Sequence, residues 1–278
     1  MIGAIIGDIA GSTFEAHNVK SKDIPIFAPK SGYTDDSLMT IAIAKALMLG
    51  VQHGVLENPV MMQTLFTQAM QYIGRSYPTM RGGYGRSFIT WLTTDSPLPY
   101  NSYGNGSAMR VSPCAYVGNT LKQVLDLAAW SAEVSHNHPE GIKGAQAIAG
   151  ATYLARKAAS KDGIREFIED DYYNLDFTLD DIRASYEFDV SCKGSVPQAI
   201  VAFLESTDFV DAIKNAISIG GDSDTIAAMT GAIAWPFYSR NLSMTKEMLR
   251  LKTEVLSGFL NGNELGEIAY EFCDTYRV

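Results

Sequence analysis

Two nearly uncharged helical segments, each opened by acidic residues, constrain the fold of this chain most. The first is Leu38–Leu49, where Lys45 is the only charged residue, and it follows the stretch Thr34-Asp35-Asp36-Ser37. A helix that is apolar on nearly all sides is usually buried in a protein core. Burial of its start would also bury two carboxylates, which is unfavourable unless they are paired or bind a metal ion.

The second segment repeats this arrangement far along the chain. The uncharged run Ile226–Trp235 follows Gly220-Gly221-Asp222-Ser223-Asp224-Thr225. Asp, Ser and Thr are preferred N-cap residues, so either stretch alone fits simple helix capping. One cap residue is sufficient for one helix, however, and carboxylates with hydroxyls are hard oxygen ligands that suit Mg²⁺, Mn²⁺ or Ca²⁺. If the two helix starts meet, the cluster would hold two divalent ions.

The charge of the chain limits its possible ligands. The formal net charge is −9, and no run of basic residues occurs, which argues against a nucleic-acid-binding surface. An anionic small molecule would have to be attracted by metal ions or by backbone N–H groups.

The cysteines and the apolar runs predict a cytoplasmic protein. The three cysteines are far apart and odd in number, which fits neither a disulfide framework nor a zinc site. The apolar start of the chain lacks a basic region and is interrupted by Asp8, so it does not resemble a signal peptide. No apolar run approaches the ~18–20 residues that span a bilayer. We therefore expect no membrane partner, and we expect a monomer.

Helical patterns cover the chain, and strand patterns are nearly absent, with at most a short strand around Ile24–Phe27. The pattern predicts a single all-α domain over residues 1–278, a multi-helix bundle with functional loops at one end. Helices are expected at 2–16, 38–50, 59–73, 87–93, 121–134, 140–159, 197–206, 208–219, 226–235, 244–260 and 264–276, with two short ones within 163–188.

The predicted N-terminal helix carries two further carboxylates, Asp8 and Glu15. On a continuous helix they share one face, about two turns apart. Glu15 could then point into the acidic cluster as a ligand or as a general acid or base. A solvated glutamate at a helix end is the alternative.

Several loop residues could bind a ligand. Gly104-Asn105-Gly106-Ser107 fits a plain hairpin turn, or a loop whose backbone N–H groups approach a pyrophosphate. His136 and His138 form an HxH pair without a third zinc ligand, which fits capping, ligand stacking or an ordinary loop position. The side chains that flank the glycine-containing loops could line an aromatic pocket; they are Arg81, Tyr84, Tyr100 and Tyr103.

Taken together, these stretches resemble the ADP-ribosylglycohydrolase family, of the dinitrogenase-reductase-activating glycohydrolase type. The resemblance follows the family's order and covers nearly the whole chain. Six segments carry it: Gly7–Glu15, Tyr33–Ser37, Gly104–Arg110, Ser135–Gly141, Gly194–Pro197 and Gly220–Thr225. Ser37 departs from the second threonine that is usual at its position, and this puts little in doubt because Ser37 is not an expected ligand.

The resemblance implies an orthogonal all-α bundle with a cleft that holds two Mg²⁺ or Mn²⁺ ions. The metal ligands would be Thr34, Asp35, Asp36, Asp222, Asp224 and Thr225. The diphosphate of ADP-ribose would lie in a cradle of Gly104, Asn105, Gly106 and Ser107, and the rest of the ligand would meet Tyr103, Met109 and His136. Glu15 would act over the scissile bond, with the metal-ligating Asp35 as the alternative general acid or base.

This set of residues predicts a metal-dependent ADP-ribosyl hydrolase that cleaves at ribose C1″ and releases ADP-ribose from a modified protein side chain or small molecule. Two alternatives stay open: a two-metal phosphohydrolase of a nucleotide pyrophosphate, and a non-catalytic family member that binds ADP-ribose. The motifs do not select among arginine, serine, O-acetyl and polymer linkages. Residues 75–103 and 160–193 are expected to shape the acceptor side.

Overall fold

The computed structural model describes residues 1–77, 83–240 and 244–278. In these ranges every regular element is a helix, and the only β-type pairing is an isolated bridge between Gly104 and Ser191. The all-α prediction is therefore confirmed. The elements are α1 (Ile2–Gly11), α2 (Asp35–Gln52), α3 (Pro59–Ser76), α4 (Arg86–Thr93), α5 (Gly106–Met109), α6 (Cys114–Val117), α7 (Leu121–Glu133), α8 (Pro139–Arg156), α9 (Lys161–Asp171), α10 (Leu179–Arg183), α11 (Cys192–Leu204), α12 (Phe209–Ser218), α13 (Ser223–Tyr238), α14 (Lys246–Glu254), η2 (Val255–Phe259) and α15 (Glu264–Tyr276).

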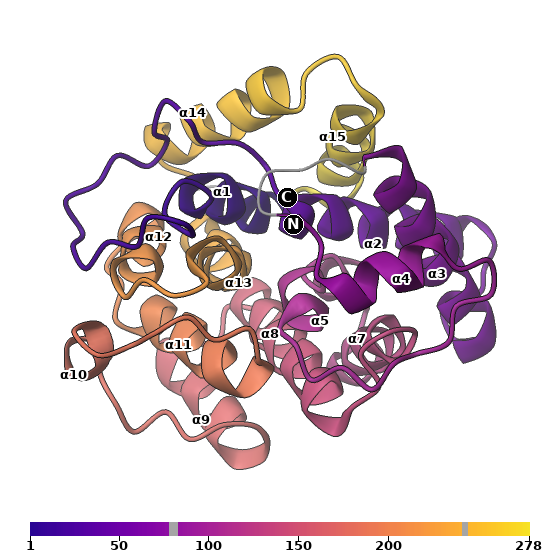
Figure 1. Cartoon of the computed structure of the whole chain (residues 1–278), viewed down its shortest axis with the longest axis horizontal. Helices are drawn as coiled ribbons and strands as arrows, with labels where there is room; N and C mark the ends of the chain where they lie inside the picture. Colours follow the sequence, from indigo (N-terminus) through magenta and orange to yellow (C-terminus); the bar gives the residue numbers. More distant parts are fainter. Residues whose placement is uncertain (78–82, 241–243) are drawn as a thin grey trace.

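The N-terminal helix α1 lies in the middle of the molecule and packs against α13 and α2 (Figure 1). Every residue of α1 is buried. Gly3, Gly7 and Gly11 recur at every fourth position, so they lie on one face of the helix. A Cβ atom at Gly7 would lie 2.1 Å from the carbonyl oxygen of Ala227. The backbones of α1 and α13 are therefore in direct contact, and a larger residue at Gly7 would force them apart.

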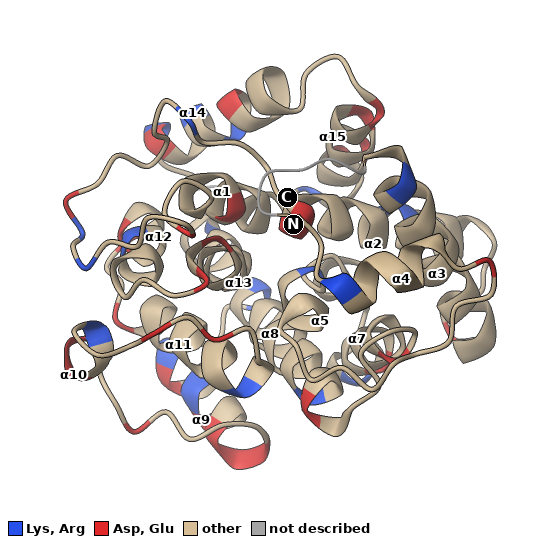
Figure 2. Cartoon of the chain, in the orientation of Figure 1, with Lys and Arg blue, Asp and Glu red and all other residues tan. Residues whose placement is uncertain are grey.

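The two helices that follow the acidic stretches are buried, as the sequence predicts. α2 is buried over most of its length, and α13 is buried from Ser223 to Pro236. Both carry few charged residues beyond their first turns, whereas charged residues are frequent on peripheral helices such as α9 and α14 (Figure 2). Gly11 of α1 lies directly against the main chain of Asp224, and the Asp8 side chain bonds the amides of Thr34 and Ser37. The starts of α13 and α2 therefore both lie against the C-terminal half of α1.

The N-terminal helix is shorter than the sequence predicts. It ends at Gly11, and Glu15 lies in the bend that follows. The Ser12 hydroxyl donates a hydrogen bond to the carbonyl of Ile9 at 2.9 Å and accepts one from the amide of Gly32 at 3.1 Å. These bonds hold the chain in its new direction, so the predicted helix face shared by Asp8 and Glu15 is wrong.

Around Ile24–Phe27, where the sequence allowed at most a short strand, the described chain forms none. Two other expectations are corrected. Helix α11 begins earlier than predicted, at Cys192, because the Ser191 hydroxyl caps it by accepting a hydrogen bond from the amide of Gly194 at 3.0 Å, and Pro197 lies inside the helix. The predicted helix 244–260 consists of α14 followed by the π-helical turn η2.

None of the helices in the described ranges has the length and apolar character needed to cross a bilayer. The cysteines Cys114, Cys192 and Cys273 are buried, and none of them forms a disulfide. The absence of a disulfide framework agrees with the expectation from their spacing.

The close contact of α1 with α13 predicts that Gly7→Ala destabilises the fold. The added methyl group would overlap the backbone of Ala227, and overpacking of this kind costs about 1–3 kcal/mol in the free energy of unfolding. Urea denaturation measures this loss. Gly163→Ala in α9 is the matched control, because its Cβ would meet only the Ser160 hydroxyl, at an ordinary 3.5 Å. Equal stability of the two variants would contradict the prediction.

Candidate active site

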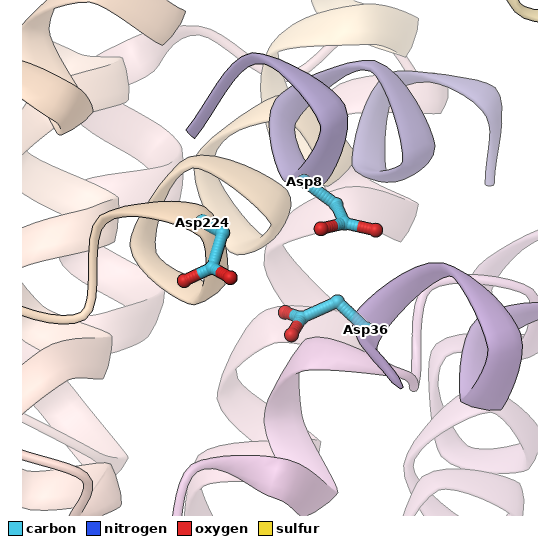
Figure 3. A group of neighbouring side chains, drawn as sticks. All are labelled: Asp8, Asp36 and Asp224. Atoms are coloured by element: carbon cyan, nitrogen blue, oxygen red, sulfur yellow. The ribbon is translucent and has the colours of Figure 1, made fainter. Parts of the chain in front are cut away.

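Three buried carboxylates converge from three helices. Asp8 comes from α1, Asp36 from α2 and Asp224 from α13, and their side chains face a common space (Figure 3). One oxygen of each lies within 4.8 Å of one oxygen of each of the others. Glu15, Asp222 and Asp224 form a second group that meets the same criterion. The two groups share Asp224, so the two acidic helix starts do meet, as the sequence led us to expect.

Helix capping does not account for these carboxylates. Thr34, not an aspartate, caps α2, since its hydroxyl accepts a hydrogen bond from the amide of Asp36 at 3.2 Å. Asp222 is the N-cap residue of α13 but makes no side-chain cap bond. One oxygen of Asp36, Oδ1, is buried and has no hydrogen-bond partner, while Oδ2 accepts from the Thr225 hydroxyl at 3.2 Å. A buried carboxylate oxygen without a partner is unfavourable unless a cation approaches it.

Asp8 organises the start of α2. Its carboxylate accepts from the amide and hydroxyl of Thr34, at 2.9 and 2.7 Å, from the amide of Ser37 at 3.0 Å, and from the Ser37 hydroxyl. These donors occupy both of its oxygens. Burial raises the pKa of Asp8 to about 6. The sequence predicts no role for Asp8. A carboxylate within a helix of small and apolar residues nevertheless indicates a side chain that is buried and hydrogen-bonded.

The carboxylates of the cluster repel one another. Burial raises the pKa values of Asp35, Asp36 and Asp224 well above the usual range, and neighbouring carboxylates raise them further. Burial also raises the pKa of Asp222, and burial followed by the charges of Asp222 and Asp8 raises that of Glu15. Like charges this close cannot all ionise without a compensating cation. The donor set, hard carboxylate and hydroxyl oxygens, fits Mg²⁺ or Mn²⁺.

Asn18 joins the bend that carries Glu15 to the loop that carries Asp222. Its side-chain amide donates to the carbonyls of Glu15 and Gly221, at 2.9 and 3.1 Å, and its oxygen accepts from the amide of Gly221 at 2.5 Å. Gly220 and Gly221 have φ angles of 70° and 74°, which glycine adopts readily. Sequence reasoning missed Asn18, since nothing in a single sequence indicates a contact over this separation.

A cavity of about 570 Å³ opens over the carboxylates. Most of the predicted site residues line it: Glu15, Asp35, Asp36, Tyr103, Gly104, Asn105, Gly106, Met109, His136, Asp222, Asp224 and Thr225. Thr34 is fully buried and does not line it. The Ser107 hydroxyl points away from it and donates to the carbonyl of Gly141 at 2.7 Å.

The glycine-containing loop is not a hairpin turn. Asn105 is the N-cap residue of the short helix α5, and its amide group donates to Oδ2 of Asp222 at 2.7 Å. This bond links the predicted diphosphate loop directly to the acidic cluster. It also shows why the plain-turn interpretation is wrong: the loop leads into α5 and not into a second strand.

Aromatic side chains form one wall of the cavity. Tyr100 meets the His136 ring edge-on, with 5.6 Å between ring centroids, and Phe88 lies behind it at 6.4 Å. Tyr84 is buried against Phe88 and does not line the cavity. Arg81, which the sequence also suggested, lies outside the described residues.

The remaining predicted loop residues have local roles or lie at the cavity edge. His138 caps α8, since its ring accepts a hydrogen bond from the amide of Glu140 at 3.0 Å. The exposed residues Phe188 and Val190 also line the cavity, and the carbonyl of Val190 accepts a hydrogen bond from the amide of Asn105 at 2.8 Å. Both belong to the segment that was expected to shape the acceptor side.

The bonds of Asp8 predict that Asp8→Asn lowers the free energy of unfolding by about 1–3 kcal/mol. The NH₂ group of asparagine is a donor, so it would replace one of the two oxygens that accept hydrogen bonds from Thr34 and Ser37. Thermal or urea unfolding measures the change. Asp208→Asn is the matched control: Asp208 caps α12 through the amide of Asp211 at 2.8 Å, and asparagine caps equally well. Equal losses in both variants would refute the special role of Asp8.

The cluster also predicts a crossover in thermal stability. In EDTA, Asp224→Asn should melt at a higher temperature than the unmodified protein, because it removes one of the mutually repelling buried charges. With Mg²⁺ or Mn²⁺ in about hundredfold excess over the dissociation constant, the unmodified protein should gain about 2.7 kcal/mol and the variant should gain less. Calorimetry measures both. If neither Mg²⁺ nor Mn²⁺ changed the melting temperature of the unmodified protein, the result would contradict a metal site.

Comparison with known proteins agrees with this geometry. Residues 1–234 match the profile of the ADP-ribosylglycohydrolase family. The ADP-ribosylhydrolase ARH3 of Mus musculus is 28% identical, over 86% of this chain and 82% of that protein, and the protein of the same name from Homo sapiens is 27% identical, over 86% and 84%. The ADP-ribosylarginine hydrolase Tri1 of Pseudomonas putida (strain GB-1) is 25% identical, over 86% and 69%.

A solved structure of an ADP-ribosylglycohydrolase-related protein complex superposes with a TM-score of 0.62, at 21% identity, over 99% of this chain and 96% of that one. At this identity the likeness concerns the fold alone. The match to the family profile covers most of the chain, from the N-terminal helix to α13. The chain therefore belongs to the ADP-ribosylglycohydrolase family.

Proposed function

We propose that this protein is an ADP-ribosyl hydrolase that uses two Mg²⁺ or Mn²⁺ ions and cleaves the glycosidic bond at ribose C1″. The observation that carries the proposal is the two clusters of carboxylates that share Asp224, of which every member except the buried Asp8 lines one cavity. Relatives of 25–28% identity are named as ADP-ribosylhydrolases and as an ADP-ribosylarginine hydrolase, which supports the same reaction class. The volume of the cavity, about 570 Å³, is in the range of about 300–1,000 Å³ for small-molecule sites.

The residues that would hold the ions are Thr34, Asp35, Asp36, Asp222, Asp224 and Thr225. The unpartnered Oδ1 atom of Asp36 supports this assignment. The Thr34 hydroxyl already donates to Asp8 and accepts from the amide of Asp36, so it keeps one lone pair for a ligand bond. When bound, the ions would supply Lewis-acid attraction for the hydroxyls of the ribose.

Glu15 is the proposed general acid or base. Its carboxyl group lies beside Asp222 and Asp224, is half-buried and lines the cavity. Burial and the charges of Asp222 and Asp8 raise its pKa, which favours a carboxyl group that can give a proton to a leaving group and later remove one from water. Asp35, which also lines the cavity, is the alternative for this role.

The loop Gly104–Gly106 would hold the diphosphate. Gly104 and Gly106 carry no side chain, and even a Cβ atom at Gly106 would make a tight contact of 3.1 Å with Nε2 of His136. An anion could therefore approach the backbone closely at these positions. Tyr103, Met109 and His136 line the same cavity and would contact the rest of the ADP-ribose. The proposed acceptor is a modified protein side chain or a small molecule, and Phe188 and Val190 are positioned at the cavity edge to meet part of the substrate.

The test is release of ADP-ribose from arginine-, serine- and O-acetyl-linked substrates by the purified protein with Mg²⁺. Glu15→Gln should lower kcat at least about 100-fold, and Asp35→Ala and Asp222→Ala should abolish turnover. Glu57→Gln, at an exposed glutamate before α3, is the control and should leave the rate unchanged. Turnover that persists in EDTA and in both aspartate variants would refute the proposal. AMP as the product would instead identify a phosphohydrolase, and binding of ADP-ribose without turnover would identify a non-catalytic member.

A further inference from the structure

A buried cation lies behind the aromatic wall of the cavity. Arg110 is only 1% exposed, and its guanidinium carbon lies 5.8 Å from the centre of the Phe88 ring. Within residues 1–77, 83–240 and 244–278 it pairs with no carboxylate. Its Nη2 atom donates to the carbonyl of Ser131 and to the hydroxyl of Ser135, both at 2.9 Å. Burial lowers its pKa to about 10, so it remains charged at neutral pH.

The Ser135 hydroxyl connects Arg110 to His136 by hydrogen bonds. A guanidinium has only donors, so Oγ of Ser135 must accept from Arg110. Its own proton is then free to donate, and Nδ1 of His136 lies 2.9 Å from Oγ. The Ser135 hydroxyl has no other hydrogen-bond acceptor in the described chain. Nε of Arg110 has no partner among the described residues, but the proton of Ser135 has an acceptor within reach. Satisfying that proton requires Nδ1 to be an unprotonated acceptor.

The other nitrogen of His136 faces the glycine-containing loop. Cβ atoms placed at Gly106 and Gly104 would lie 3.1 and 3.6 Å from Nε2, and His136 lines the cavity. Burial, and then the charge of Arg110, lowers the pKa of His136 well below its usual value, so the ring is neutral. A neutral imidazole whose Nδ1 accepts a hydrogen bond carries its proton on Nε2.

We propose that Arg110 and Ser135 are positioning residues that hold His136 as its Nε2–H tautomer, so that it donates a hydrogen bond to an oxygen of a diphosphate at Gly104–Gly106. The opposite tautomer would turn a nitrogen lone pair toward the anion, which is repulsive. The identity of the ligand rests on the proposed function, whereas the tautomer is a property of the free protein.

Nitrogen-15 NMR of the full chain without ligand tests the tautomer directly. Two-bond proton–nitrogen correlations distinguish protonated from unprotonated ring nitrogens, and His136→Gln assigns the signals. We expect an unprotonated Nδ1 and a protonated Nε2 in the unmodified protein, and a mixture of tautomers in Ser135→Ala. Ser131→Ala is the matched control, because Arg110 bonds the backbone carbonyl of Ser131 while the Ser131 hydroxyl donates to Ala128. A protonated Nδ1 in the unmodified protein, or an unchanged pattern in Ser135→Ala, would overturn the proposal.

Calorimetric titration with ADP-ribose tests whether the Nε2–H tautomer of His136 contributes to ligand binding. In Ser135→Ala the ligand would have to select the Nε2–H form from the mixture, so the affinity should fall by the inverse of the fraction of that form, about twofold for an equal mixture. Ser131→Ala should bind as the unmodified protein does. Equal affinity of the two variants would overturn the assignment of His136 as a donor to the ligand. A protein that shows the expected tautomer but never releases ADP-ribose would refute the proposed function and still support the positioning by Arg110 and Ser135.

Discussion

The direct backbone contact between α1 and α13 is the constraint on which the site depends. Glycines on one face of α1 let the two helices approach until atoms of the main chains touch. Asp8 leaves α1 toward the start of α2 and binds Thr34 and Ser37 there. The same short helix therefore fixes where α2 and α13 begin relative to each other, and with them the aspartates of both acidic stretches.

The acidic cluster is unfavourable for the fold by itself and is supported from its surroundings. Asp8 is fully supplied with donors, Asp222 is bonded by Asn105, and Asp36 is bonded by Thr225 on one oxygen. The second oxygen of Asp36 has no partner. A buried carboxylate oxygen without a donor, in a group of mutually repelling carboxylates, is what a cation site requires, because the ion replaces the missing donor and cancels the repulsion. Active sites are also where such perturbed carboxylates usually occur.

The aromatic wall of the cavity is held by a different kind of network. Arg110 is the charged member of this network. Through Ser135 it orients the proposed N–H group of His136, which is itself neutral. A neutral donor near a diphosphate attracts it without the desolvation that a second buried cation would need. The bond from Asn105 to Asp222 joins the proposed diphosphate loop to the acidic cluster, so the two parts of the site are directly connected.

Much of this protein could be predicted from the sequence, because the strongest signals are local. Helices α2 and α13 followed from runs without charge. The excess of carboxylates over what capping needs favoured a metal cluster on the condition that the two acidic starts meet, and the family resemblance implied that they do. Other features could not be predicted, because each depends on a partner distant in the sequence. They are the end of α1 at Gly11, the hydrogen bond of the Ser107 hydroxyl to Gly141, and the contacts of Asn18 and Arg110. The sequence by itself determined that the fold is helical, where its most buried helices lie and which oxygens are available as ligands, since these follow from local composition and periodicity. Only the tertiary structure decided which oxygens are already bonded and which face the cavity, since hydrogen bonds between helices form only when packing brings their ends together.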